Sequence, residues 1–111
     1  MQRQESARLL SEVCEYIQHL HEKFRYDRTI CIERSGYALY KDAIALVGGP
    51  AKQVPFNPAR EIESLPIKGK RILLFDDSIR TGTTLKRARE RLLAVGAKDV
   101  DLAATADIPQ K

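Results

Sequence analysis

Two adjacent carboxylates stand at the end of an apolar run and directly before a turn rich in hydroxyl side chains. The run is RILLF at residues 71–75, the acids are Asp76 and Asp77, and the turn continues to Thr84. Neighbouring carboxylates repel each other unless a cation or a hydrogen-bond donor relieves them. A hydrogen bond to a charged group contributes about 1.5–3 kcal/mol. The acid pair therefore suits a ligand with vicinal hydroxyl groups, such as a ribose.

The turn after the acids has the composition of a phosphate site. Its last residues, Thr81 to Thr84, stand where a helix is expected to begin. Amide groups at a helix N-terminus have no internal partner and lie at the positive end of the helix dipole, so they bind anions. Gly82 allows a positive φ or a close approach of the backbone. An ordinary N-cap uses the same residue types, but the neighbouring acids favour a sugar phosphate, with its diol on the carboxylates and its 5-phosphate on the turn.

Strands and helices that would position these groups alternate along the chain. We expect strands at 29–33, 53–56, 71–75 and 99–106 and helices at 4–25, 37–47 and 83–94. This order predicts a single α/β domain over residues 1–111, with a parallel sheet and right-handed crossovers. Ligands of such sheets bind beyond the carboxyl ends of the strands. The ERSG segment at 33–36 and the acidic turn should therefore lie at the same edge.

The expected first helix carries an apolar stripe with helical spacing, formed by Leu10, Val13, Ile17, Leu20 and Phe24. Such a stripe either packs on the sheet or joins two copies of the chain. His19 and His21 point to different faces of this helix, and we expect both to be solvated rather than to act as ligands. In the expected helix at 83–94, residues Leu85, Ala88 and Leu92 should face inward, and Gly96 should cap its end.

The composition is that of an ordinary soluble domain. Of the 111 residues 43% are hydrophobic and 31% are charged, and the net charge of +4 is compatible with a phosphate-bearing ligand or with nucleic acid. Cys14 and Cys31 do not form a C-x-x-C pair, and we expect buried thiols. The sequence has no signal-like segment and no apolar run long enough for a membrane span, so we expect a cytoplasmic protein without membrane partners.

The segment ILLFDDSIRTGTT, residues 72–84, resembles the phosphoribosyl pyrophosphate motif of type I phosphoribosyltransferases. The ERSG segment sits where that family has its pyrophosphate loop. Residues 95–109 resemble the segment that follows the motif helix in amidophosphoribosyltransferases, and the DDS and GTT elements point the same way. The resemblance implies a small three-layer α/β fold with a parallel sheet, as a minimal or truncated core of the family.

The resemblance also implies a role for each motif residue. Asp76 and Asp77 would form the catalytic pair that binds the ribose 2- and 3-hydroxyls. The 5-phosphate would be held by Ser78, Ile79, Arg80, Thr81, Gly82, Thr83 and Thr84. Pyrophosphate would contact Arg34, Ser35 and Gly36, with Mg²⁺ bridging it to the ribose and no direct protein ligand to the metal. In this family a nitrogen nucleophile displaces pyrophosphate from the ribose C1 through an oxocarbenium-like transition state.

Two parts of the family pattern are short or missing here. The lid between the second and third strands would be only residues 55–69, with Arg60 or Lys52 as its cation, and no hood for the acceptor is recognisable. We therefore expect a homodimer that completes the site, and weak or absent transfer to purine and pyrimidine bases. The alternative is a non-catalytic ligand-binding or regulatory protein of the same fold.

Two other classes compete with this interpretation. A truncated response-regulator receiver would place its acids after a first strand and use Asp107 as phosphoacceptor. Only 30 positions separate Asp77 from Asp107, too few for the elements that normally intervene. A nucleic-acid-binding module would use the basic helix, whose positive residues are Lys86, Arg87, Arg89 and Arg91. Glu90 interrupts that run and no recognised motif supports it, so nucleic acid is a possible but unsupported partner.

Overall fold

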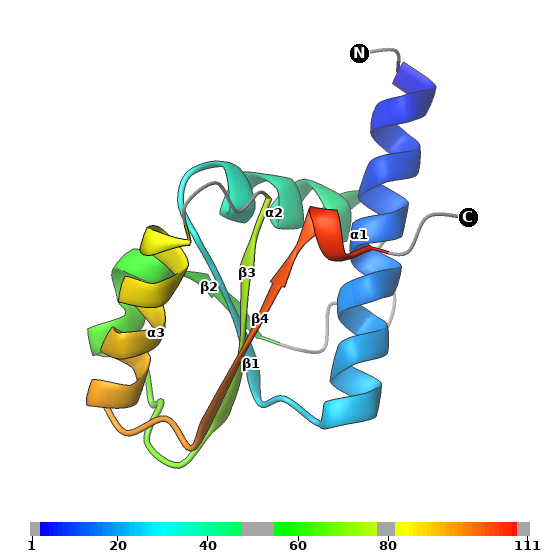
Figure 1. The fold of residues 1–111 in the computed structure, drawn as a ribbon. Helices are drawn as coiled ribbons and strands as arrows, with labels where there is room; N and C mark the ends of the chain where they lie inside the picture. Colours follow the sequence, from blue (N-terminus) through cyan, green and yellow to red (C-terminus); the bar gives the residue numbers. More distant parts are fainter. Residues whose placement is uncertain (1–2, 48–54, 78–81, 109–111) are drawn as a thin grey trace.

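The computed structural model describes residues 3–47, 55–77 and 82–108. Its four parallel strands, in the order β2-β1-β3-β4, are β1 Arg28–Cys31, β2 Phe56–Pro58, β3 Arg71–Asp76 and β4 Asp99–Ala104. Its helices are α1 Arg3–Phe24, α2 Ser35–Val47 and α3 Thr83–Ala94, and two short 3₁₀ helices are η2 Ala59–Ser64 and η3 Thr105–Asp107. The parallel α/β fold expected from the sequence is confirmed (Figure 1).

The sheet separates two apolar cores. Alternate side chains of a strand point to opposite faces, so the continuous apolar run of β3 is buried on both. On one face α1 and α2 cover Cys31, Leu73, Phe75 and Ala103. On the other face η2 and α3 cover the side chains of Ile30, Ile32, Ile72, Leu74 and Val100. Figure 1 shows α3 and α1 on opposite sides of the sheet, which gives the three expected layers.

The apolar stripe of α1 lies mostly inside the domain. Val13 and Ile17 are fully buried, Leu10 and Leu20 pack against the same core, and Phe24 is 36% exposed. Of the two roles expected for the stripe, packing within the chain is confirmed. Assembly into a dimer stays a prediction.

The expectation of a solvated His21 is wrong, whereas His19 is exposed as expected. His21 is only 7% exposed, and its Nε2 forms a hydrogen bond of 2.5 Å with the hydroxyl of Thr29 at the start of β1. The chain reverses at Arg25, whose φ is 59°, and the ring of Tyr26 packs edge-on against His21. This reversal brings β1 against the last turn of α1, and burial there lowers the pKa of His21.

Residues 55–69 do not form a lid. They contain β2 and η2, and the side chains of Ile62 and Ile67 are buried in the core under α3. The strand expected at 53–56 is found at Phe56–Pro58 instead, with residues 53 and 54 outside the described part of the chain. Pro58 is compatible with this strand because β2 lies at the sheet edge.

The last strand ends at Ala104 rather than at residue 106, because the chain turns into η3. The Asp107 carboxylate accepts a hydrogen bond of 2.9 Å from the Ala104 amide and so stops the strand. Within the described ranges no helix is long and apolar enough to cross a membrane.

Candidate active site at the carboxyl edge of the sheet

Three strand ends meet at one edge of the sheet, as the topology requires of parallel strands. Beyond β1, the Ile32 amide donates a hydrogen bond of 2.8 Å to the Phe75 carbonyl of β3. Beyond β4, the Thr105 hydroxyl donates to the Asp77 carbonyl. The loop at 33–36, the acid pair and η3 are thereby tied together, which confirms that the first two lie side by side.

Gly36 lies directly against the acid pair. A Cβ atom at this position would be 3.0 Å from Asp76 Cα, 3.0 Å from Asp76 Oδ1 and 3.3 Å from the Phe75 carbonyl oxygen. Atoms of a tightly packed interior cannot give way freely at such distances, so any side chain here would push the end of β3. The glycine of ERSG is therefore needed for the contact between the two loops.

The acid pair is only partly accessible. Asp76 and Asp77 are both half-buried at the end of β3, and the Asp77 amide donates a hydrogen bond of 2.7 Å to Asp76 Oδ1. Together with the bond from Thr105, this fixes the backbone of Asp77. The two carboxylates are thus held at the end of a rigid central strand, where an arriving ligand would meet them.

The turn that follows leads into the N-terminus of α3. Gly82 has φ 75° and ψ −4°, a left-handed conformation that favours glycine, and its carbonyl accepts the first helical bond from Lys86 at 2.9 Å. The first turn of α3 contains no acidic residue, and Thr83 and Thr84 are exposed there. Such an end suits an anion. The other residues expected to hold the 5-phosphate, Ser78, Ile79, Arg80 and Thr81, lie outside the described residues.

The loop after β1 exposes two of its three expected ligand-binding residues. Arg34 and Ser35 are exposed and Gly36 is buried. The Arg34 carbonyl accepts from Ala38 at 3.0 Å as α2 begins, and the Glu33–Arg34 peptide bond is cis. This arrangement leaves the two polar side chains at the same edge as the acids.

Arg60, one of the two cations expected for a lid, is already engaged. Its amide and its Nη1 donate to the two carboxylate oxygens of Glu33, at 2.5 and 2.9 Å. Lys52, the other candidate, lies outside the described residues. Arg60 is thus paired with Glu33, the residue that directly precedes the loop at 34–36.

Two residues of η3 were not among the expected site residues. The Thr105 hydroxyl ties the end of β4 to the backbone just beyond β3, and the Asp107 carboxylate caps the Ala104 amide at the end of β4. Asp107 thus serves as a backbone cap, which differs from the phosphoacceptor that a receiver domain would require. The only signal in the sequence is an acid three residues after the last buried residue of a strand, a pattern typical of helix starts.

The two cysteines are free and buried, as expected. Cys31 lies in β1 beneath the acid pair, and burial, followed by the nearby charge of Asp76, raises the pKa of its thiol. Burial also raises the pKa of Cys14. Neither thiol is therefore suited to act as a nucleophile at neutral pH.

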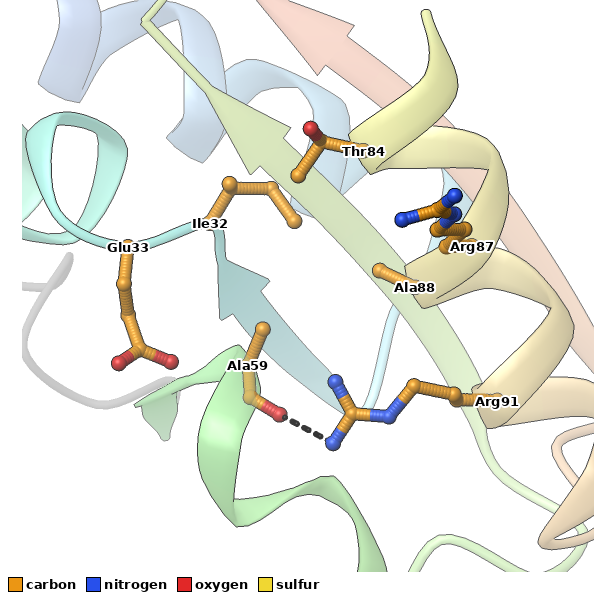
Figure 2. Close-up of a pocket in the computed structure, with 7 residues that line it drawn as sticks. All are labelled: Ile32, Glu33, Ala59, Thr84, Arg87, Ala88 and Arg91. Carbon is orange, nitrogen blue, oxygen red and sulfur yellow. Dashed lines mark hydrogen bonds between the residues drawn. The ribbon is translucent and has the colours of Figure 1, made fainter.

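A cavity of about 390 Å³ opens beside this edge, on the face covered by α3 (Figure 2). It lies between the end of β1, η2 and the first turns of α3. Its lining consists of Ile32, Glu33, Ala59, Thr84, Arg87, Ala88 and Arg91. No feature of the sequence alone indicated this cavity, because its walls come from three separate segments.

Residues 49–111 match the family model of the phosphoribosyl transferase domain. Similar solved structures include a purine phosphoribosyltransferase from Pyrococcus horikoshii, with 22% identity, a TM-score of 0.64, and coverage of 94% of this chain and 74% of that one. An HGPRT-ase from Leishmania tarentolae in complex with GMP has 12% identity and a TM-score of 0.63, with coverage of 91% and 65%. A hypoxanthine-guanine phosphoribosyltransferase from Bacillus anthracis has 16% identity and a TM-score of 0.64, with coverage of 89% and 65%.

Because these sequence identities are low, the likenesses establish the fold and nothing more. The chain spans about two thirds of the length of the Leishmania and Bacillus enzymes. A comparison with curated protein sequences gave no match.

Proposed function

The chain belongs to the phosphoribosyl transferase domain family, and on that premise we propose that it binds phosphoribosyl pyrophosphate or a ribose 5-phosphate. The observation that carries the proposal is the contact of Gly36 with Asp76, where a Cβ would lie 3.0 Å from the aspartate backbone. It places the loop proposed for pyrophosphate and the acids proposed for the ribose within the length of one ligand.

Each part of the ligand then has a partner of suitable chemistry. The ribose hydroxyls donate to the carboxylates of Asp76 and Asp77, through hydrogen bonds strengthened by the negative charge. The 5-phosphate lies at the left-handed turn of Gly82 and the N-terminus of α3. Pyrophosphate lies on Arg34, Ser35 and the backbone at Gly36.

The proposed reaction is displacement at the ribose C1. The C1–O bond breaks with its electron pair leaving on pyrophosphate, a C1–N bond forms, and the attacking nitrogen loses a proton. The ribose passes through an oxocarbenium-like state, so the protein has mainly to hold the reacting groups in place and stabilise the departing charge. The rigid anchoring of Asp77 by Thr105 supports this positioning role.

Mg²⁺ is the proposed cofactor. Within the described residues no group of three or more His, Cys, Asp and Glu side chains could hold a metal ion. The negative charge of Asp76 and Asp77 suits a Mg²⁺ ion that would stay on the phosphate oxygens of the ligand without being ligated directly by the protein. The ion would be held mainly by the ligand's own oxygens. When bound, it would neutralise charge on the pyrophosphate.

The acceptor is proposed from the resemblance of residues 95–109 to amidophosphoribosyltransferases. It favours a small nitrogen nucleophile over a purine or pyrimidine base. The test compares pyrophosphate release in the presence of ammonium ions, hypoxanthine or guanine. Brisk turnover of a free base by this chain would contradict the proposal.

A second candidate is a ligand-binding protein without transferase activity. It is favoured by the packing of residues 55–69, because Ile62 and Ile67 anchor this segment in the core and it cannot close over the site. Binding of phosphoribosyl pyrophosphate without release of pyrophosphate, for every acceptor tried, would identify this case.

We also propose that the chain forms a homodimer that completes the site. The partly exposed Phe24 at the end of α1 offers apolar surface for such a contact. Sedimentation equilibrium is expected to give twice the chain mass. A monomer would leave the α1 stripe with its role inside the domain alone.

The experiment that tests the ligand assignment is a titration with two probes, ribose 5-phosphate and inorganic phosphate. Asp76→Asn and Asp77→Asn should weaken the binding of ribose 5-phosphate more than that of inorganic phosphate. Each substitution removes a negative charge that is proposed to contact the sugar and leaves the phosphate turn unchanged. An unchanged preference between the two probes in both variants would show that the acids do not bind the sugar.

A further inference from the structure

The cavity beside the acidic edge has an apolar floor and a charged rim. Ile32, Ala59 and Ala88 present short or aliphatic side chains to it, and its volume of about 390 Å³ lies in the range of small-molecule pockets. Figure 2 shows Glu33 on one wall and Arg87 with Thr84 on the opposite wall. A ligand in the cavity would therefore meet both acidic and basic side chains.

Two charged residues of the lining, Glu33 and Arg91, each form an ion pair with a residue outside the lining. Glu33 is bound by Arg60 at 2.5 and 2.9 Å. Arg91 donates to the Ala59 carbonyl at 3.1 Å and to both carboxylate oxygens of Glu63, at 2.5 and 3.0 Å. These bonds fix η2 against β1 and α3, so the cavity is formed before any ligand arrives.

Arg87 is different from the other charged groups of the rim. Across the ranges that the structure describes, no hydrogen bond or ion pair reaches its guanidinium. Its side chain is exposed at the surface of α3 and lines the cavity next to Thr84. The α3 wall therefore carries a positive charge that is not compensated from within this part of the protein.

The cavity also adjoins both loops of the proposed ligand site. Glu33 directly precedes the loop at 34–36, and Thr84 ends the turn that follows Asp77. In a displacement at C1 the nucleophile enters on the face opposite the leaving pyrophosphate. The cavity borders the loop proposed for the leaving pyrophosphate, because Glu33 lines it and directly precedes that loop.

We propose that the pyrophosphate group of phosphoribosyl pyrophosphate extends into this cavity and that Arg87 binds its distal phosphate. The inference rests on the proposed function and adds a residue to it. A guanidinium pairs with two phosphate oxygens at once and keeps its charge at any physiological pH. Placed there, it stabilises the charge that develops as pyrophosphate departs. Arg87 thereby supplies a cation to the leaving group from α3.

The test is isothermal titration calorimetry of three probes in the presence of Mg²⁺: phosphoribosyl pyrophosphate, inorganic pyrophosphate and ribose 5-phosphate. It compares the unmodified chain with Arg87→Gln and with Arg89→Gln. Arg89 is exposed on the same helix and does not line the cavity. The two variants lose the same charge, so the comparison separates a local contact from a general electrostatic effect.

We expect Arg87→Gln to weaken both pyrophosphate-containing probes at least tenfold and to leave ribose 5-phosphate within twofold. Arg89→Gln should leave all three probes within twofold. The inference would be overturned if both variants lost affinity for the pyrophosphate-containing probes equally, or if Arg87→Gln lost none, provided that ribose 5-phosphate still bound. A loss confined to inorganic pyrophosphate would indicate a site for the free anion and would also overturn it. Failure of the unmodified chain to bind ribose 5-phosphate would instead overturn the proposed function.

Discussion

Gly36→Ala should reduce both the stability of the fold and its affinity for ribose 5-phosphate. The added Cβ would lie 3.0 Å from Asp76 Cα, and a backbone atom at the end of a central strand cannot rotate out of the way. Overpacking of this kind costs about 1–3 kcal/mol. Alanine regains about 0.5–1 kcal/mol over glycine because Gly36 lies in the first turn of α2. The expected net loss in the free energy of unfolding is about 0–2.5 kcal/mol.

The assay is urea denaturation together with titration of ribose 5-phosphate. Gly69→Ala is the matched control, because Gly69 has a φ of 76° and no atom within 4 Å of its hypothetical Cβ. It should cost about 1–2 kcal/mol through backbone strain alone and leave ligand affinity unchanged. If Gly36→Ala were as stable as the unmodified chain and bound ribose 5-phosphate equally well, the contact between the two loops would not position the acids.

Three further predictions concern other parts of the structure. Gly82→Val should abolish phosphate binding and cost about 1–2 kcal/mol of stability, since Gly82 has φ 75°; unchanged phosphate titrations would contradict it. His21 has a pKa lowered by burial, so its neutral form stabilises the fold above the ordinary histidine pKa of about 6.5. That stability should fall as the pH drops below this value, by at most about 1.4 kcal/mol per pH unit. In urea denaturation between pH 7.5 and 5, His21→Gln should flatten the dependence of the free energy of unfolding on pH, and His19→Gln should not. Equal slopes in the unmodified chain and both variants would refute the assignment. Thr105→Val removes the donor to the Asp77 carbonyl, costs about 1 kcal/mol, and should weaken ribose 5-phosphate more than inorganic phosphate; Thr105→Ser should restore both, and failure to do so would assign the effect to packing.

The parts of the fold that follow from local patterns could be predicted from the sequence. The continuous apolar run of β3 indicates a strand buried on both faces, and it is one. The spacing of Leu85, Ala88 and Leu92 gives the buried face of α3. A glycine before that helix allows a positive φ, and Gly82 has a φ of 75°. Each of these features depends on a period or a turn within a few residues.

The features that sequence reasoning missed depend on contacts between distant segments. His21 is buried because the reversal at Arg25 brings Thr29 against the last turn of α1. The helical spacing of α1 shows only that His19 and His21 lie on different faces of the helix. Residues 55–69 contain three prolines, which predict a loop. Ile62 and Ile67 nevertheless pack into a core under α3 that the local composition does not reveal. The cavity lined by Arg87 likewise arises only when three segments meet.

The central claim is that the acidic edge binds phosphoribosyl pyrophosphate, and its most direct test is the free energy of unfolding with and without this ligand and Mg²⁺. At 100 times its dissociation constant the ligand should raise that free energy by about 2.7 kcal/mol. The increase should shrink in Asp76→Asn and Asp77→Asn. An unchanged free energy of unfolding at millimolar phosphoribosyl pyrophosphate with Mg²⁺ would contradict the account.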